Sequence, residues 1–199
     1  MARTFRTIGA LAVWTGLLLQ YWLMVRGRGG EELIYRTINF FSYFTILSNI
    51  LCAVCLTLPT ATENPVLRTG IALYISVTGG IYVLILKDLW APTGLQWVAD
   101  TLLHYVTPAF FLIDWALLSR KGALKWRSAL IWLGFPLLYA VWTLAHGAQS
   151  GFWPYPFMDA SKLGMTRVLT NVAGLIVGFL GLSLLFVLID HALARWRRG

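Results

Sequence analysis

The sequence predicts an all-α, polytopic membrane protein with six transmembrane helices in one bundle. Hydrophobic residues make up 58% of the 199 residues and charged residues 12%, whereas soluble domains contain about half and about a quarter, respectively. The mean hydropathy is +0.71. Six apolar segments also have the length of roughly twenty residues that spans a bilayer. Composition and segment length together place the protein in a membrane.

The six predicted spans are Thr7–Val25, Ile38–Leu58, Thr69–Leu86, Val98–Leu118, Arg127–His146 and Met165–Asp190. The first span is long and lacks a small-residue cleavage site, so we expect a retained helix rather than a signal peptide. The connections are short and contain turn-forming residues at Gly27–Gly30, Pro59–Pro65, Pro92–Gly94 and Pro154–Pro156. Because no linker divides the chain, we expect residues 1–199 to form a single transmembrane domain.

The basic residues predict the orientation. Ten of the sixteen Lys and Arg residues lie at the two ends of the chain and in the second and fourth loops. They are Arg3, Arg6, Arg68, Arg120, Lys121, Lys125, Arg127, Arg195, Arg197 and Arg198. The positive-inside rule therefore places both termini in the cytoplasm, with the protein in the cell membrane. Anionic lipid headgroups account for the net charge of +8, and we expect no nucleic-acid partner because no soluble basic face is available.

Cys52 and Cys55 form a C-x-x-C pair inside the second predicted span. This spacing on a helix makes a disulfide awkward, and no second cysteine pair completes a metal site. We therefore expect both thiols to serve as packing groups. The sequence predicts no metal and no cofactor.

Polar residues within the fourth predicted span form a stripe. Asp100, His104, Thr107 and Asp114 fall within one quadrant of a helix that turns by about 100° per residue. Polar groups are costly in lipid and usually face a bundle interior or a cavity. The stripe therefore predicts a polar site.

The second predicted span carries a similar cluster, formed by Ser42, Thr45, Asn49 and Cys52. Thr45 lies seven residues from the start of this span, and His104 lies six residues from the start of the fourth. At ~1.5 Å per residue, both would lie roughly 10 Å below the non-cytoplasmic surface. Further polar groups are expected at this level: Tyr82, Lys87, Asp88, Trp142, His146, Thr166, Arg167, Thr170 and Asn171. We therefore expect a polar cavity in the outer leaflet.

A threonine hydroxyl and an imidazole at the same depth suggest acyl transfer. The hydroxyl of Thr45 needs a base to take its proton, and histidine performs this role well. Asp100, one turn from His104, either orients the imidazole or is only solvated at the interface. Arg167 or Asn171 would donate to an oxyanion. Hydroxyls in membrane helices more often bond to a backbone carbonyl, however.

Two other functions fit the same residues. In a lipid- or ion-binding or transport protein, Asp88, Asp100, Arg167 and Asn171 would be ligands or gates. In a haem b protein, His104 and His146 would ligate the iron.

Three stretches resemble a known family, in order along the chain: "YFTILSN" (43–49), "DTLLHYVTPAFFLID" (100–114) and "GFWPYPF" (151–157). They are similar to the androgen-induced and androgen-dependent TFPI-regulating membrane proteins (the FAR-17a-like family), including their bacterial six-span branch. The resemblance extends in helix order over nearly the whole chain.

This resemblance implies intramembrane hydrolysis of fatty acid esters of hydroxy fatty acids by a threonine-type carboxylic ester hydrolase. It assigns the nucleophile to Thr45 and the base to His104. We expect Asn49 to line or brace the cavity. Trp153 and Tyr155, together with Phe157, would cap the cavity or belong to an ordinary interfacial aromatic belt. The expected partner is a membrane lipid such as a fatty acyl ester.

Overall fold

The computed structural model describes residues 1–58 and 63–197. Helices account for 83% of the structure, and the described residues contain no strand. Five helices are long and apolar enough to cross a membrane, or six if one bent pair counts as a single span. The all-helical, membrane-spanning class is therefore confirmed. Part of the predicted turn at Pro59–Pro65 and the terminal Arg198 lie outside the described residues.

The chain divides into two compact units, Met1–Ala123 and Leu124–Gly199, and each is described by itself. The single domain expected from the sequence stays a prediction.

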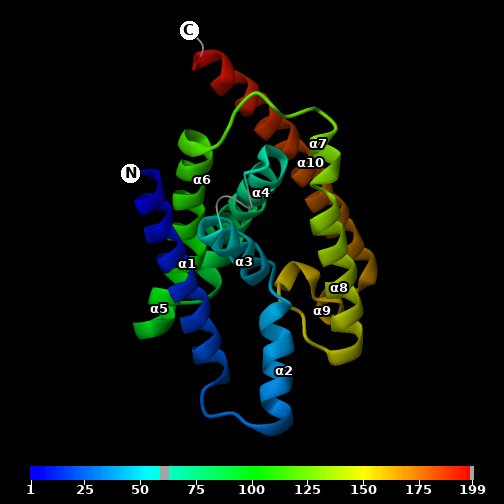
Figure 1. Ribbon diagram of the computed structural model, residues 1–199. Helices are drawn as coiled ribbons and strands as arrows, with labels where there is room; N and C mark the ends of the chain where they lie inside the picture. The colour runs from blue at the N-terminus through cyan, green and yellow to red at the C-terminus, as the bar shows by residue number, and fades with distance from the viewer. Residues whose placement is uncertain (59–62, 198–199) are drawn as a thin grey trace. The chain divides into compact units, whose positions relative to one another are not determined.

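The first unit contains the helices α1 to α6 (Figure 1). Their bounds are α1 Ala2–Val25, α2 Gly30–Phe41, α3 Phe44–Thr57, α4 Pro65–Ile81, α5 Gly94–Thr101 and α6 Thr107–Leu118. Two π-helical turns, η1 Tyr82–Leu86 and η3 Leu102–Val106, extend α4 and join α5 to α6, and a 3₁₀ turn, η2 Lys87–Leu89, follows η1. The third predicted span begins earlier than expected because Asn64 caps α4 through bonds from the N–H groups of Val66 and Leu67.

Small residues let α1 pack closely against the segment η3 to α6, beside which it runs in Figure 1. A Cβ atom at Gly16 would lie 3.0 Å from Leu103 Cδ2, and one at Gly9 would lie 2.2 Å from the ring of Phe110. Glycine thus allows close packing of membrane helices. The side chain of Leu103, on the turn that carries His104, is 1% exposed as a result.

The second predicted span, Ile38–Leu58, is not one straight helix. The helices α2 and α3 meet at Ser42 and Tyr43 with a bend of 73°. Ser42 Oγ donates to the carbonyl of Ile38 at 2.8 Å, a bond to the preceding turn that favours bending, and Tyr43 has extended backbone angles. Neither glycine nor proline marks this break. The prediction of one continuous helix was therefore wrong. Counting ~1.5 Å per residue from Ile38 to Thr45 no longer supports the predicted depth of Thr45, which stays a prediction.

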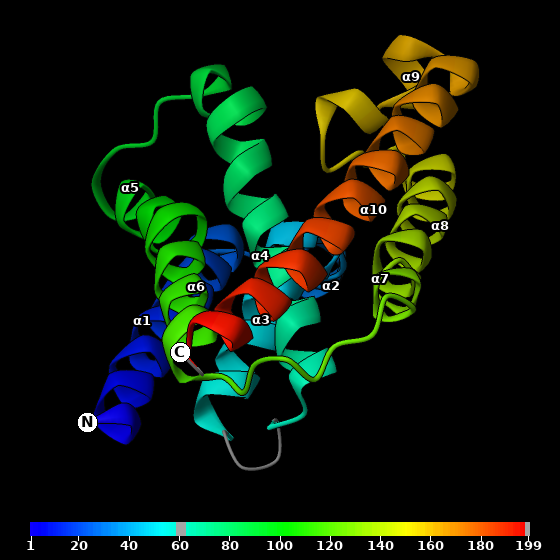
Figure 2. The same cartoon turned by 90° about the horizontal axis from the view of Figure 1, so that it is seen from above.

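The second unit contains α7 Ser128–Ile131, α8 Gly134–Ser150, the 3₁₀ turn η4 Pro156–Met158, α9 Ala160–Leu163 and α10 Met165–Trp196. Both α7 and α8 run beside α10 in Figures 1 and 2. Gly151 ends α8 with φ of 72°, the left-handed conformation that glycine adopts without strain.

Candidate functional site

Asp100 and His104 form an acid–imidazole pair in the first unit. Nδ1 of His104 lies 3.1 Å from the backbone oxygen of Asp100 and 3.1 Å from its Oδ1. The Nδ1–H direction satisfies hydrogen-bond geometry only with the backbone oxygen, since Oδ1 has no hydrogen-bond partner among the described residues. These contacts assign the proton to Nδ1 in the neutral ring. Nε2 is then the nitrogen that can accept a proton.

The pair lies where the helix changes from α5 to the π-helical turn η3. The N–H of Thr107 donates to the carbonyl of Leu102, five residues earlier. Pro108 explains the wide turn, because it has no N–H to donate to the carbonyl of His104 and its ring would clash with that carbonyl in a regular α-helix. Such π-helical turns occur frequently at functional sites.

The wide turn also changes the predicted polar stripe. It takes up one extra residue, which rotates the following helix by about 100° relative to a continuous α-helix. Thr107 and Asp114 therefore do not extend the Asp100–His104 face as the sequence predicted. Thr107 is 3% exposed, and Asp114 pairs with arginines instead.

Asn49 links the helix of Thr45 to the turn of His104. Its Nδ2 donates to the carbonyl of Thr45 at 2.8 Å and to the carbonyl of Leu103 at 3.2 Å. Two carbonyl acceptors fix which side-chain atom is the nitrogen. Asn49 is fully buried, and its Oδ1 has no hydrogen-bond partner within the described part of the chain. The bracing position expected of Asn49 fits these contacts.

Thr45 is the second residue of α3 and is 8% exposed. Ser48, one turn further on, bonds to the carbonyl of Phe44 at 2.8 Å and to the hydroxyl of Thr78 at 2.7 Å. Ser48 therefore has a structural role, joining α3 to α4.

The other four predicted site residues belong to the second unit. Trp153 packs on the backbone of Gly147, where a Cβ atom would fall 2.4 Å from its ring. Tyr155 is stacked on Phe157 with ring centroids 5.2 Å apart. Asn171 Nδ2 donates to the carbonyl of Phe157 at 2.8 Å, whereas Arg167 is exposed. Their approach to Thr45 and His104 stays a prediction.

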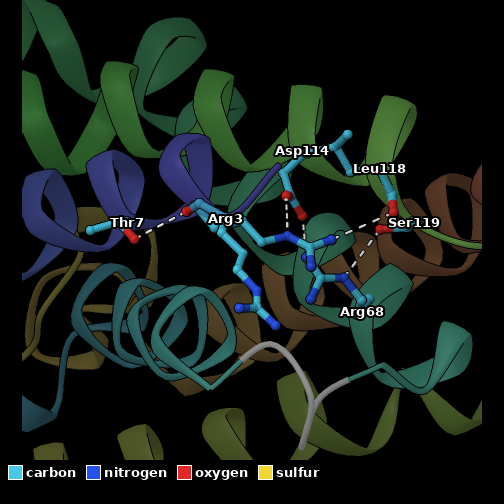
Figure 3. Close-up of polar contacts among 7 residues, drawn as sticks. Arg3, Thr7, Arg68, Asp114, Leu118 and Ser119 are labelled. Carbon is cyan, nitrogen blue, oxygen red and sulfur yellow. Dashed lines mark hydrogen bonds and ion pairs between the residues drawn. The ribbon is translucent and has the colours of Figure 1, made fainter. Parts of the chain in front are cut away.

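The structure contains a second polar cluster that was not predicted from the sequence. Asp114 is fully buried and accepts from Arg6 Nε at 2.7 Å through Oδ1. Arg68 Nη2 makes a close contact with Oδ2 of the same carboxylate. Arg68 Nε also donates to Ser119 Oγ at 3.1 Å, and Figure 3 shows Arg68 reaching both Asp114 and Ser119.

The predicted place of Arg68 in the second loop was wrong, because Arg68 lies in α4 and its side chain is 3% exposed. Asp114 is the residue from which this cluster could have been predicted, since a carboxylate in an apolar segment requires a cation or a hydrogen-bond donor.

Cys52 and Cys55 are both buried and are not joined in a disulfide, as a packing role requires. Within residues 1–58 and 63–197, no three His, Cys, Asp or Glu side chains are grouped to hold a metal ion.

The fold and the site define an all-helical membrane protein in which a buried carboxylate and an imidazole lie within contact distance at a π-helical turn. The family described as FAR-17a/AIG1-like protein matches residues 82–190, more than half of the chain. The chain belongs to this family. Asp100, His104, Trp153, Tyr155, Arg167 and Asn171 lie inside the matched range. A search of curated proteins and a search of solved structures each gave no match.

Proposed function

We propose that the chain is an intramembrane lipid-ester hydrolase in which Thr45 is the nucleophile and His104 is the base. The observation that carries the proposal is the contact of His104 Nδ1 with Asp100, which leaves Nε2 as the proton acceptor. Family membership is consistent with a membrane hydrolase. The bonds from Asn49 to Thr45 and Leu103 support the pairing, because they connect the two elements that carry the reacting groups.

In the proposed reaction, Nε2 of His104 takes the hydroxyl proton as Thr45 Oγ attacks the ester carbonyl. The tetrahedral intermediate collapses to an acyl-threonine, and the imidazolium returns the proton to the departing alcohol. His104 then takes a proton from water, whose oxygen attacks the acyl-threonine and releases the acid. The imidazolium returns this proton to the departing Thr45 Oγ, which regenerates the hydroxyl and the neutral imidazole.

Electrostatics favour this assignment of roles. Thr45 lies in the first turn of the fourteen-residue helix α3, where the positive end of the helix dipole stabilises developing negative charge. The carboxylate of Asp100 would stabilise the imidazolium that forms during attack. Arg167 and Asn171 are the proposed oxyanion donors.

The proposed substrate is a lipid ester of the class of fatty acid esters of hydroxy fatty acids, which enters from the outer leaflet. Trp153 and Tyr155 would cap its cavity. In this proposal the chain is a bacterial six-span member of its family, α2 and α3 together form one span, and both termini face the cytoplasm of a cell-membrane protein.

The proposal is tested by ester turnover with the purified full chain in lipid nanodiscs. A panel of fatty acyl esters is offered to the wild type and to the Thr45→Val, Thr45→Ser and His104→Ala variants. We expect Thr45→Val and His104→Ala to lose activity and Thr45→Ser to retain part of it. Thr57→Val, on the same helix, is the matched control.

A fluorophosphonate that labels serine and threonine nucleophiles provides a second readout. It should label the wild type and Thr57→Val but not Thr45→Val. Equal labelling or equal turnover in Thr45→Val refutes the nucleophile assignment. Lipid binding without turnover by the wild type favours a binding or transport protein instead.

A further inference from the structure

Tyr82 contacts both members of the Asp100–His104 pair. Its ring is stacked on the imidazole of His104, with centroids 4.0 Å apart and planes inclined by 15°. Its hydroxyl donates to Asp100 Oδ2 at 2.5 Å. We propose that Tyr82 is a positioning residue, which holds the carboxylate and the imidazole in the orientation that presents Nε2 of His104. This inference rests on the proposed function of His104 as a base.

The two oxygens of Asp100 have separate roles in this arrangement. Oδ2 accepts the hydroxyl of Tyr82, and Oδ1 faces Nδ1 of His104. Asp100 is 4% exposed and Tyr82 is also 4% exposed, so water does not compete strongly for either bond. The three side chains close a ring of contacts between two separate parts of the chain.

Positioning is needed because the final torsions of both side chains are soft. The χ2 torsions of Asp and His have broad minima, unlike the three sharp wells of aliphatic torsions. A bond to Oδ2 fixes the rotation of the carboxylate. A parallel ring at 4.0 Å resists rotation of the imidazole, because turning it would drive its edge into the tyrosine. Nδ1 is thereby kept against Asp100.

The backbone explains how Tyr82 reaches this place. Tyr82 begins the π-helical turn η1, in which the N–H of Lys87 donates to the carbonyl of Tyr82. Gly79 lies one turn earlier, and a Cβ atom there would be 3.2 Å from the backbone oxygen of His104 and 3.1 Å from Pro108 Cβ. The close approach that glycine permits brings the Tyr82 ring onto the imidazole.

Tyr82→Phe and Tyr82→Leu separate the two contacts. Phenylalanine keeps the stacked ring and loses the hydroxyl, whereas leucine loses both. Tyr21→Phe is the matched control, because it removes a tyrosine hydroxyl that bonds to Thr37 Oγ1 at 3.1 Å elsewhere in the same unit.

The first readout is the ¹⁵N spectrum of the full chain labelled at histidine, in nanodiscs, at a pH where the rings are neutral. The signals of His104 are assigned by their loss in His104→Gln. We expect the Nδ1–H form to dominate in the wild type and in Tyr21→Phe, and to lose population in Tyr82→Phe and further in Tyr82→Leu. An unchanged His104 spectrum in both Tyr82 variants overturns the proposal.

The second readout is ester turnover. Tyr82→Phe should lower kcat about tenfold, the rate equivalent of one lost hydrogen bond to a charged group, with KM within about twofold. A rise in KM at constant kcat overturns the positioning role. If the wild type hydrolyses no ester, the proposed function fails, whereas the histidine spectrum still decides whether Tyr82 orients His104.

Discussion

Two aspartates on one helical stretch, Gly94–Leu118, have opposite surroundings. Asp114 is fully buried, and each of its oxygens takes a guanidinium N–H from Arg6 or Arg68. Asp100 faces an imidazole whose side chain is 14% exposed. Arginine keeps its proton at every accessible pH, whereas histidine gains and loses one near neutrality. The first carboxylate is therefore suited to holding helices together, and the second is suited to supporting proton transfer.

The local backbone also differs between the Asp114 cluster and the Asp100–His104 pair. Asp114 lies in the regular helix α6, whereas His104 lies in the π-helical turn η3. The Asp114 cluster joins α1, α4 and α6. A π-helical turn thus lies in the segment that carries the candidate chemistry, as is frequent at functional sites.

The largest expected effect comes from breaking the Asp114 cluster. Asp114→Asn leaves two largely buried guanidinium groups without their carboxylate, so we expect a loss of about 3–5 kcal/mol in the free energy of unfolding. Denaturant unfolding in detergent, followed by circular dichroism, measures this loss. The combined variant Arg6→Met, Arg68→Met, Asp114→Leu should recover most of it, because apolar replacement of a buried ionic cluster is often neutral. A stable Asp114→Asn protein would show that the cluster carries little energy.

Asp100→Asn should have the converse phenotype. The amide cannot stabilise an imidazolium as a carboxylate does, so we expect kcat to fall about 100-fold. The amide oxygen can still accept the Tyr82 hydroxyl, so the free energy of unfolding should fall by only about 1 kcal/mol. Ester turnover and unfolding are measured on the same preparation. Asp88→Asn, an exposed aspartate on η2, is the control and should match the wild type. A stability loss as large as that of Asp114→Asn would remove the contrast between the two sites.

Gly79→Ala tests the helix packing beside the Asp100–His104 pair, not that of the Asp114 cluster. The new methyl group would lie 3.1 Å from Pro108 Cβ and 3.2 Å from the oxygen of His104, so we expect about 1 kcal/mol of destabilisation and a several-fold lower kcat. Gly80→Ala is a matched control, because its Cβ position has no atom within 4 Å among the described residues beyond its own helical turn. It should be neutral, or stabilising by up to about 1 kcal/mol through helix propensity. Equal effects of the two changes contradict this account.

The smallest effect concerns a third aspartate, Asp159, which precedes α9 and pairs with Lys162 at 3.4 Å. Ser161 donates to Asp159 from its N–H and its hydroxyl. The bond from the hydroxyl, helped by Lys162, lowers the pKa of the Asp159 carboxyl. A lowered native pKa stabilises the fold above the unfolded pKa, and this contribution is lost as the pH falls through the acidic range.

The melting temperatures of wild type and Asp159→Asn should therefore differ slightly at neutral pH and converge in acid. A difference that persists after the carboxyl is protonated points to another cause.

Residue types along the chain were sufficient for part of the candidate site. The sequence indicated Asp100 and His104 as a helical pair, and the structure brings them within contact distance. Asn49 was expected to brace the cavity, and its two bonds join the elements of Thr45 and His104. The sequence predicted Tyr82 only as one of several polar groups at the same level. Its stacking on His104 could not be predicted, because the packing of neighbouring helices decides which ring lies against the imidazole.

Two features of the backbone could not be predicted from the sequence, because they depend on competition between alternative hydrogen bonds to the backbone. The break at Ser42 has no glycine or proline to announce it, and a side-chain bond to Ile38 accompanies it. The wide turn at His104 was signalled by Pro108, but a proline alone does not specify whether a helix kinks, ends or widens.

By itself, the sequence determined that the protein is helical and apolar enough to span a membrane, because hydrophobic content and segment length set this independently of packing. It also determined which residues are costly to bury. Only the tertiary structure decided the partners from other helices that offset this cost: Arg6 and Arg68 for Asp114, and Tyr82 for Asp100. The reason is physical, since a buried polar group accepts any partner of suitable charge and geometry, and the packing of the helices selects which one is within reach.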